Sequence, residues 1–140
     1  MYVLRVQNKN DNKIGYYSCR IFKGHYLCEY RNPIPVRDKT FMNNLYKKRK
    51  VTNNNFYFGF TSFTQFRNWF YNSSINKYLM SYDVLELAIY KVHKNNVIIG
   101  DAQCAFLLDK ATKVYSTRIN LTKKVFLRQI SLAKLPVSLV

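Results

Sequence analysis

The chain has 140 residues, 48% of them hydrophobic, and a net charge of +16 from 23 Lys and Arg against 7 Asp and Glu. This length predicts one domain with an ordinary core, and the hydrophobic content excludes a disordered chain. The charge favours a polyanionic partner, although AT-rich codons would account for part of it. No apolar run approaches the ~20 residues that span a bilayer, and no secretion signal is recognised, so we expect a cytoplasmic protein.

The predicted strands are short apolar or alternating segments. The first half offers Tyr2 to Val6, two segments between 16 and 30, and the aromatic segment Phe56 to Phe60. The second half offers Val84 to Val92, 97–99, 102–108 and 114–121. Val84 to Val92 is apolar on both faces, as a central strand is. Together they predict a single α+β domain over 1–140, with a twisted, mostly antiparallel sheet of five to seven short strands and one main helix, at about 62–72, packed on it.

The main helix is predicted to begin at Ser62. With Gln65 three residues later, Ser62 has the spacing of a capping box. Phe63, Phe66 and Phe70 then follow at i, i+3 and i+7, which places them on one helical stripe. An apolar stripe of this kind predicts a helix that packs on the sheet.

The most polar segment is 36–55, which we interpret as an exposed, mobile connection in which Phe41 and Leu45 could line a short helix. A dense basic cluster follows Tyr46 and consists of Lys47, Lys48, Arg49 and Lys50. Such a cluster can bind phosphates, and an exposed Tyr can stack on unpaired bases. The alternative is a solvated loop. Any nucleic-acid binding is expected to be phosphate-dominated and salt-sensitive.

Residues suited to catalysis or metal binding are few. Cys19, Cys28 and Cys104 form no CxxC pair, and no His has metal-ligand spacing, so we expect buried thiols and no metal site. Asp38 is expected in a polar loop. Glu86 interrupts an apolar strand, and we expect it to face solvent or pair with a Lys. No Walker loop, HExxH or GxSxG motif is present.

The segment 122–140 fits neither the helical nor the strand period. We expect a C-terminal arm that either packs on the sheet or contacts a partner. The apolar residues available for such a contact are Val125, Phe126, Leu127, Ile130 and Leu132.

Several stretches together resemble a group of small, mostly uncharacterised proteins encoded by phages and prophages. The stretches are Tyr2 to Val6, Gly15 to Tyr17, Asn32 to Pro35, Phe58 to Ser62 with Trp69 and Phe70, Val84 to Val92, and Gln103 to Phe106. They cover roughly residues 2 to 115. The resemblance implies a phage protein that acts in the host cytoplasm, in host takeover or counter-defence.

The order of these elements also resembles the ADP-ribosyltransferase-like split sheet. The resemblance implies that Arg5 holds NAD, that Ser62 lies at the strand-to-helix step, and that Gln103 occupies the position of the catalytic Glu. A neutral amide does not stabilise a developing cation as a carboxylate does. Asp101, expected on the same face as Gln103, is then the only substitute. The resemblance therefore implies this fold with lost or altered catalysis.

Two hypotheses follow. The first is a small, basic, non-enzymatic binding protein of phage type that needs no cofactor and binds a nucleic acid or an acidic host protein. The alternative is an ADP-ribosyltransferase-like enzyme, or a dinucleotide-binding protein, with a degenerate catalytic site.

Overall fold

The computed structural model describes residues 1–15, 38–49, 56–70, 83–120 and 122–140. Predictions for the other residues, including the two strand segments between 16 and 30 and the side chain of Lys50, lie outside this part of the chain. The described strands are β1 (Tyr2–Asn8), β2 (Phe56–Gly59), β3 (Leu85–Val92), β4 (Val97–Ile99), β5 (Cys104–Leu107) and β6 (Ala111–Thr117). The described α-helices are α2 (Lys39–Arg49), α3 (Phe63–Trp69) and α5 (Lys123–Leu132).

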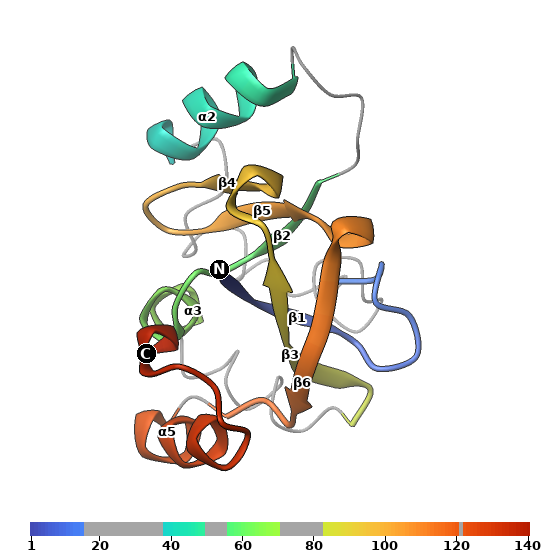
Figure 1. The fold of residues 1–140 in the computed structure, drawn as a ribbon, viewed down its shortest axis with the longest axis vertical. Helices are drawn as coiled ribbons and strands as arrows, with labels where there is room; N and C mark the ends of the chain where they lie inside the picture. Colours follow the sequence, from blue (N-terminus) through green and yellow to red (C-terminus); the bar gives the residue numbers. More distant parts are fainter. Residues whose placement is uncertain (16–37, 50–55, 71–82, 121) are drawn as a thin grey trace.

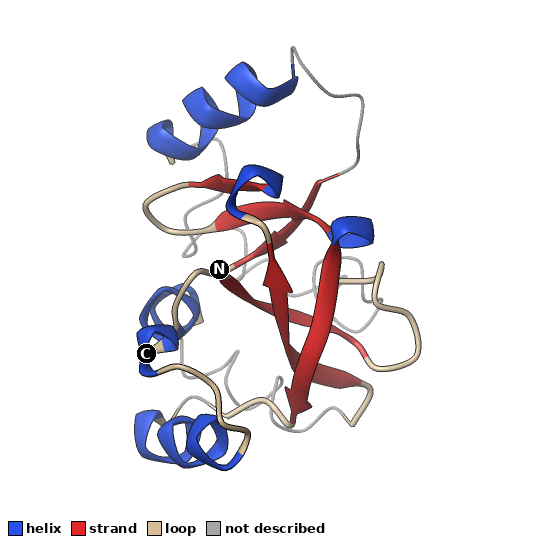
Figure 2. Ribbon diagram, viewed as in Figure 1, coloured by secondary structure: helices blue, strands red, loops and turns tan. Residues whose placement is uncertain are grey.

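The strands form two three-stranded antiparallel sheets, in the orders β1-β3-β6 and β2-β5-β4. The α+β class is confirmed, and the strands divide between two sheets where the sequence suggested one. Figure 2 shows the strands gathered in the middle of the molecule, and in Figure 1 α2 and α5 lie at its two ends.

The sheets meet where β1 passes the end of β2. Leu4 and Phe60 exchange two backbone hydrogen bonds of 2.8 Å there. A Cβ at Gly59 would lie 2.5 Å from Val3 Cγ1 and 2.7 Å from the carbonyl oxygen of Leu4. Only glycine therefore allows β2 to approach β1 this closely.

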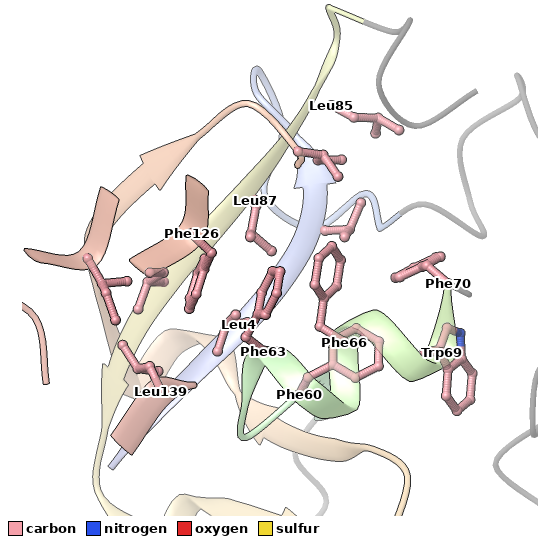
Figure 3. Packing of buried hydrophobic residues seen from close by; sticks show 14 residues of the cluster. Leu4, Phe60, Phe63, Phe66, Trp69, Phe70, Leu85, Leu87, Phe126 and Leu139 are labelled. Atoms are coloured by element: carbon pink, nitrogen blue, oxygen red, sulfur yellow. The ribbon is translucent and has the colours of Figure 1, made fainter. Parts of the chain in front are cut away.

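The larger core lies between β1, β3, α3 and α5. Phe63, Phe66 and Phe70 of the predicted stripe are all buried, and Trp69 joins them. Figure 3 shows Phe63 and Phe66 of α3 on the side where Leu4 and Leu87 lie, with Phe70 and Trp69 at the far end of the helix. Ser62 caps α3 as predicted, because its hydroxyl accepts a 3.2 Å hydrogen bond from the Gln65 N–H. The helical stripe is thus the core-facing side of α3.

The short helix lined by Phe41 and Leu45 is confirmed, but the expectation of an exposed, mobile connection is wrong for residues 38–49. This segment is helix α2, and the buried Asp38 caps it by accepting the Phe41 N–H at 2.9 Å. The other carboxylate oxygen of Asp38 accepts the Ala102 N–H, also at 2.9 Å. Phe41 packs with Ile98 of β4, which fixes the helix on the smaller sheet. The polar-loop prediction for Asp38 failed because its polarity serves an internal cap.

The C-terminal segment packs on the larger core. Phe126 and Ile130 of α5 are about 1% exposed, so of the two alternatives expected for this segment, internal packing holds for them and partner contact does not. The rings of Phe126 and Phe63 stack with centroids 4.3 Å apart. Leu127 is partly buried, whereas Val125 and Leu132 are exposed. The apolar residues of this segment therefore divide between the core and the surface.

Candidate functional site

The outward face of α2 is polar and carries two of the predicted binding residues. Tyr46 is 68% exposed, and Lys47 beside it is also exposed. The inward face is held by hydrogen bonds, since Asn44 Nδ2 donates to the carbonyl of Ile99 at 2.8 Å. Tyr46 and Lys47 are consequently presented by a docked helix.

The basic cluster is not uniform. Lys48 lies on the inward side of α2, where its ammonium group donates to the carbonyls of Asn95 and Val97. Lys48 therefore helps to dock α2, while the side chains of Arg49 and Lys50 lie outside the described residues. Lys47 is the described member of the cluster that faces outward. Cations at the C-terminal end of a helix also suit its dipole, so part of the cluster has a structural reason.

Two of the acids lie inside the protein. Asp38 caps α2, as described above. Glu86 is 7% exposed and accepts hydrogen bonds from Gln7 Nε2 at 2.9 Å and Lys113 Nζ at 3.2 Å. The hydroxyl of Tyr90 donates to Gln7 Oε1 at 2.8 Å and completes the network. The predicted pairing of Glu86 with a Lys is confirmed, and its role is structural.

The exposed charged side chains among the described residues are predominantly basic, although Arg5 and Lys48 are not exposed. The exposed acids among the described residues are Asp11, Asp83, Asp101 and Asp109. The exposed basic residues are Lys9, Lys13, Lys39, Lys47, Arg67, Lys91, Lys94, Lys110, Lys113, Arg118, Lys123, Lys124, Arg128 and Lys134. The basic side chains occur on strands, helices and turns, so the positive field extends beyond α2.

A pocket of about 200 Å³ lies at the junction of the two sheets. Its lining includes Arg5 of β1, Tyr57 of β2 and Gln103, which directly precedes β5. Arg5 is 4% exposed, and its guanidinium donates to the carbonyls of Phe58 at 2.7 Å and of Asn12 and Lys13 at 3.4 Å. Burial lowers the pKa of Arg5, although the guanidinium stays charged at any ordinary pH.

Gln103 is the second polar group of the pocket. It is 2% exposed, and its Nε2 has no hydrogen-bond acceptor among the described residues. Buried polar side chains nearly always have a partner, so an orphan amide needs an explanation. The resemblance to the ADP-ribosyltransferase-like split sheet implied one site for Arg5 and Gln103, and both residues line this pocket. Sequence reasoning missed Tyr57, whose ring centroid lies 5.2 Å from the Arg5 guanidinium carbon.

The other residues of the implied NAD site do not join the pocket. The Ser62 hydroxyl is engaged as the cap of α3. Asp101 does not share a face with Gln103, because residues 101 and 102 form a bend before β5, and Asp101 is exposed where Gln103 is buried. Asp101 instead accepts a 2.9 Å hydrogen bond from the hydroxyl of Thr40. The expectation that Asp101 lies on the same face as Gln103 is therefore wrong.

The cysteine in the described part of the chain is not suited to nucleophilic chemistry. Cys104 is buried as predicted, and burial raises the pKa of its thiol, which disfavours the nucleophilic thiolate. No group of His, Cys, Asp and Glu among these residues has the arrangement of a metal site. No helix among them is long and apolar enough to cross a membrane.

Comparison with known proteins confirms the predicted relation to phage proteins. The chain matches the family model described as the bacteriophage T4 Y00F protein over residues 1–120. No curated protein and no solved structure gives a significant match. Because the family model covers most of the 140 residues, the chain belongs to the bacteriophage T4 Y00F protein family.

Proposed function

We propose that this phage protein is a non-enzymatic binder of single-stranded nucleic acid in the host cytoplasm, with a role in host takeover or counter-defence. The observation that carries the proposal is the placement of charge. Asp38 and Glu86 are internal, whereas Lys47 and most other described basic residues are exposed. A surface of this kind attracts polyanions and binds phosphates with strong salt dependence.

Tyr46 favours a nucleic acid over an acidic protein. Its ring is 68% exposed beside the exposed Lys47, so an aromatic surface and a cation lie next to each other on one helix. Unpaired bases stack on such rings, and a stacked base contributes about 1–3 kcal/mol. A duplex does not offer its base faces in this way, which is why the proposal names a single strand.

The test compares two Lys to Ala variants that change the net charge equally. Lys47→Ala removes a charge from α2, and Lys110→Ala removes an exposed charge from another part of the chain. Fluorescence anisotropy with labelled oligothymidylate, a matched duplex and polyglutamate measures binding from low to physiological salt. Loss of one phosphate contact lowers the slope of log K against log salt by about 0.7 for a single strand. We expect that change for Lys47→Ala and a smaller one for Lys110→Ala.

Tyr46 provides the second arm of the test. Tyr46→Phe retains the ring and should bind as the unaltered protein does, whereas Tyr46→Ala should bind oligothymidylate about tenfold more weakly. Absence of binding to any nucleic acid at low salt would reject the proposal. Binding to polyglutamate alone would also reject it, in favour of an acidic protein partner.

The second candidate is an ADP-ribosyltransferase-like enzyme or a dinucleotide-binding protein. One observation favours it, because Arg5 and Gln103 line the same pocket. This candidate has less support than the binding function. Gln103 is neutral, Ser62 is engaged as a helix cap, and Asp101 is exposed and does not line the pocket. Incubation with labelled NAD and host lysate tests this candidate, and the absence of both transfer and binding would reject it.

A further inference from the structure

The pocket between the sheets is lined by a glutamine whose amide donor no described residue accepts. Gln103 lines the pocket, and its Nε2 is buried with no acceptor in the described chain. An unmade hydrogen bond of this kind is unfavourable in the free protein, and it is relieved when a ligand brings an acceptor.

Gln7 provides an internal comparison for Gln103. It is also fully buried, but its amide donates to Glu86 and its carbonyl accepts from Tyr90. Two buried glutamines in one protein therefore differ in whether the fold satisfies them. The described residues provide partners for the side chain of Gln7 and none for Gln103 Nε2, which leaves that donor available to a ligand.

Arg5 indicates the charge of the ligand that would bind in the pocket. Its guanidinium is bound by three carbonyl oxygens, and the ion pairs of the described residues, Lys113–Glu86 and Arg118–Asp83, do not include it. Carbonyl oxygens satisfy N–H groups without neutralising the cation. A buried cation without an anion is costly, so an anionic ligand would be stabilised here.

The lining residues and the volume of the pocket indicate the shape and size of the rest of the ligand. Val6 and the aromatic residues Phe56, Tyr57, Phe58 and Phe60 contribute to the lining, and the pocket measures about 200 Å³. This is smaller than the roughly 300–1,000 Å³ of drug-sized ligand sites. We propose that the pocket binds a small molecule made of a single flat ring with one carboxylate or phosphate, its anionic group held by Arg5 and Gln103.

The test begins with the stability of two matched variants in the absence of ligand. Gln103→Met removes the orphan donor at nearly constant volume and should raise Tm, because nothing in the fold loses a partner. Gln7→Met makes the same change where the amide is satisfied and should lower Tm, because it leaves Glu86 and Tyr90 with fewer partners. A fall in Tm for Gln103→Met would show a structural role for Gln103 and overturn the proposal.

Binding is then measured by titration calorimetry and by the side-chain amide NMR signal of Gln103, assigned by its loss in Gln103→Met. The probes are benzoate and phenyl phosphate, with neutral benzamide and inorganic phosphate as controls. At least one of the two ring anions should shift the Gln103 signal and bind more tightly than both controls. The better of the two distinguishes a carboxylate ligand from a phosphate ligand.

The variants locate the bound anion. Gln103→Met should bind the better probe roughly tenfold to a hundredfold more weakly, which is the effect of one hydrogen bond to a charged group. Arg5→Lys, which keeps the charge but loses the planar fork, should also bind more weakly. Absence of binding by both ring anions, or unchanged binding in Gln103→Met, would reject the site. These results are independent of nucleic-acid binding, because Tyr46 and Lys47 do not line the pocket.

Discussion

The docking of α5 gives a prediction whose size follows from the structure. Phe126→Ala removes a ring that is 1% exposed and stacks at 4.3 Å on Phe63. A buried Phe replaced by Ala costs about 3–5 kcal/mol, and a domain of this kind is stable by about 5–15 kcal/mol. With a urea slope of about 2 kcal/mol per M, the unfolding midpoint should fall by roughly 2 M.

Leu132→Ala is the matched control on the same helix. Leu132 is 75% exposed, so its truncation should change the free energy of unfolding by no more than about 0.5 kcal/mol. Urea unfolding followed by circular dichroism and by Trp69 fluorescence measures both variants. A loss below about 1 kcal/mol for Phe126→Ala would show that α5 is a detachable arm and would refute its assignment to the core.

Two further predictions concern the smaller sheet. Gly100→Ala should destabilise the protein by about 1–3 kcal/mol, because the new Cβ would lie against Phe41 Cβ and 2.5 Å from Asp38 Oδ2. Urea unfolding measures this change, and an unaltered midpoint would contradict the close docking of α2. Cys104 should resist iodoacetamide at pH 8 in the folded protein, since burial raises the pKa of its thiol and little thiolate forms at that pH. Mass spectrometry of the digested protein measures this, with urea-unfolded protein as the control, and equally rapid labelling in both states would contradict the burial.

Local patterns predicted the strands and α3 because their signals are contained in a few neighbouring residues. The stripe of Phe63, Phe66 and Phe70 specifies a buried helical face whatever it packs against. The division into two sheets was not predictable in this way. The division is decided by which strands pair, and strand pairing depends on contacts between residues as distant in sequence as Leu4 and Phe60.

The sequence suggested a short helix lined by Phe41 and Leu45, but not its docking, because polar contacts hold much of the inward face of α2. Phe41 is fully buried, but Asn44 and Lys48 dock the helix by donating to backbone carbonyls of the smaller sheet and the turn before it. Such a face gives only a weak apolar periodicity, since the sequence shows polar residues wherever the acceptors belong to another element. The same reasoning explains the burial of Asp38, because its second hydrogen bond comes from the N–H of the distant Ala102.

The candidate site was predictable only in part. The resemblance to the ADP-ribosyltransferase-like split sheet drew attention to Arg5 and Gln103, and the fold brings both to one pocket. That Gln103 lacks an acceptor among the described residues is a property of three-dimensional packing, which no local sequence pattern contains. Asp101 illustrates the opposite error, because a spacing of two residues places side chains on one face only within a continuous strand. Residues 101 and 102 form a bend before β5 begins at Cys104.

Codon bias could raise the number of Lys residues, but it does not determine where the carboxylates lie. Asp38 and Glu86 each have a defined internal role, so their charges are largely withdrawn from the surface for reasons of folding. Arg5 and Lys48 are not exposed either, so the fold does not add to the positive excess, which is either a by-product of composition or a selected feature. The paired Lys variants separate these explanations, because a by-product predicts equal losses of affinity from Lys47→Ala and Lys110→Ala. A selected site on α2 predicts that Lys47 contributes more, and that removal of the Tyr46 ring weakens binding without any change in charge.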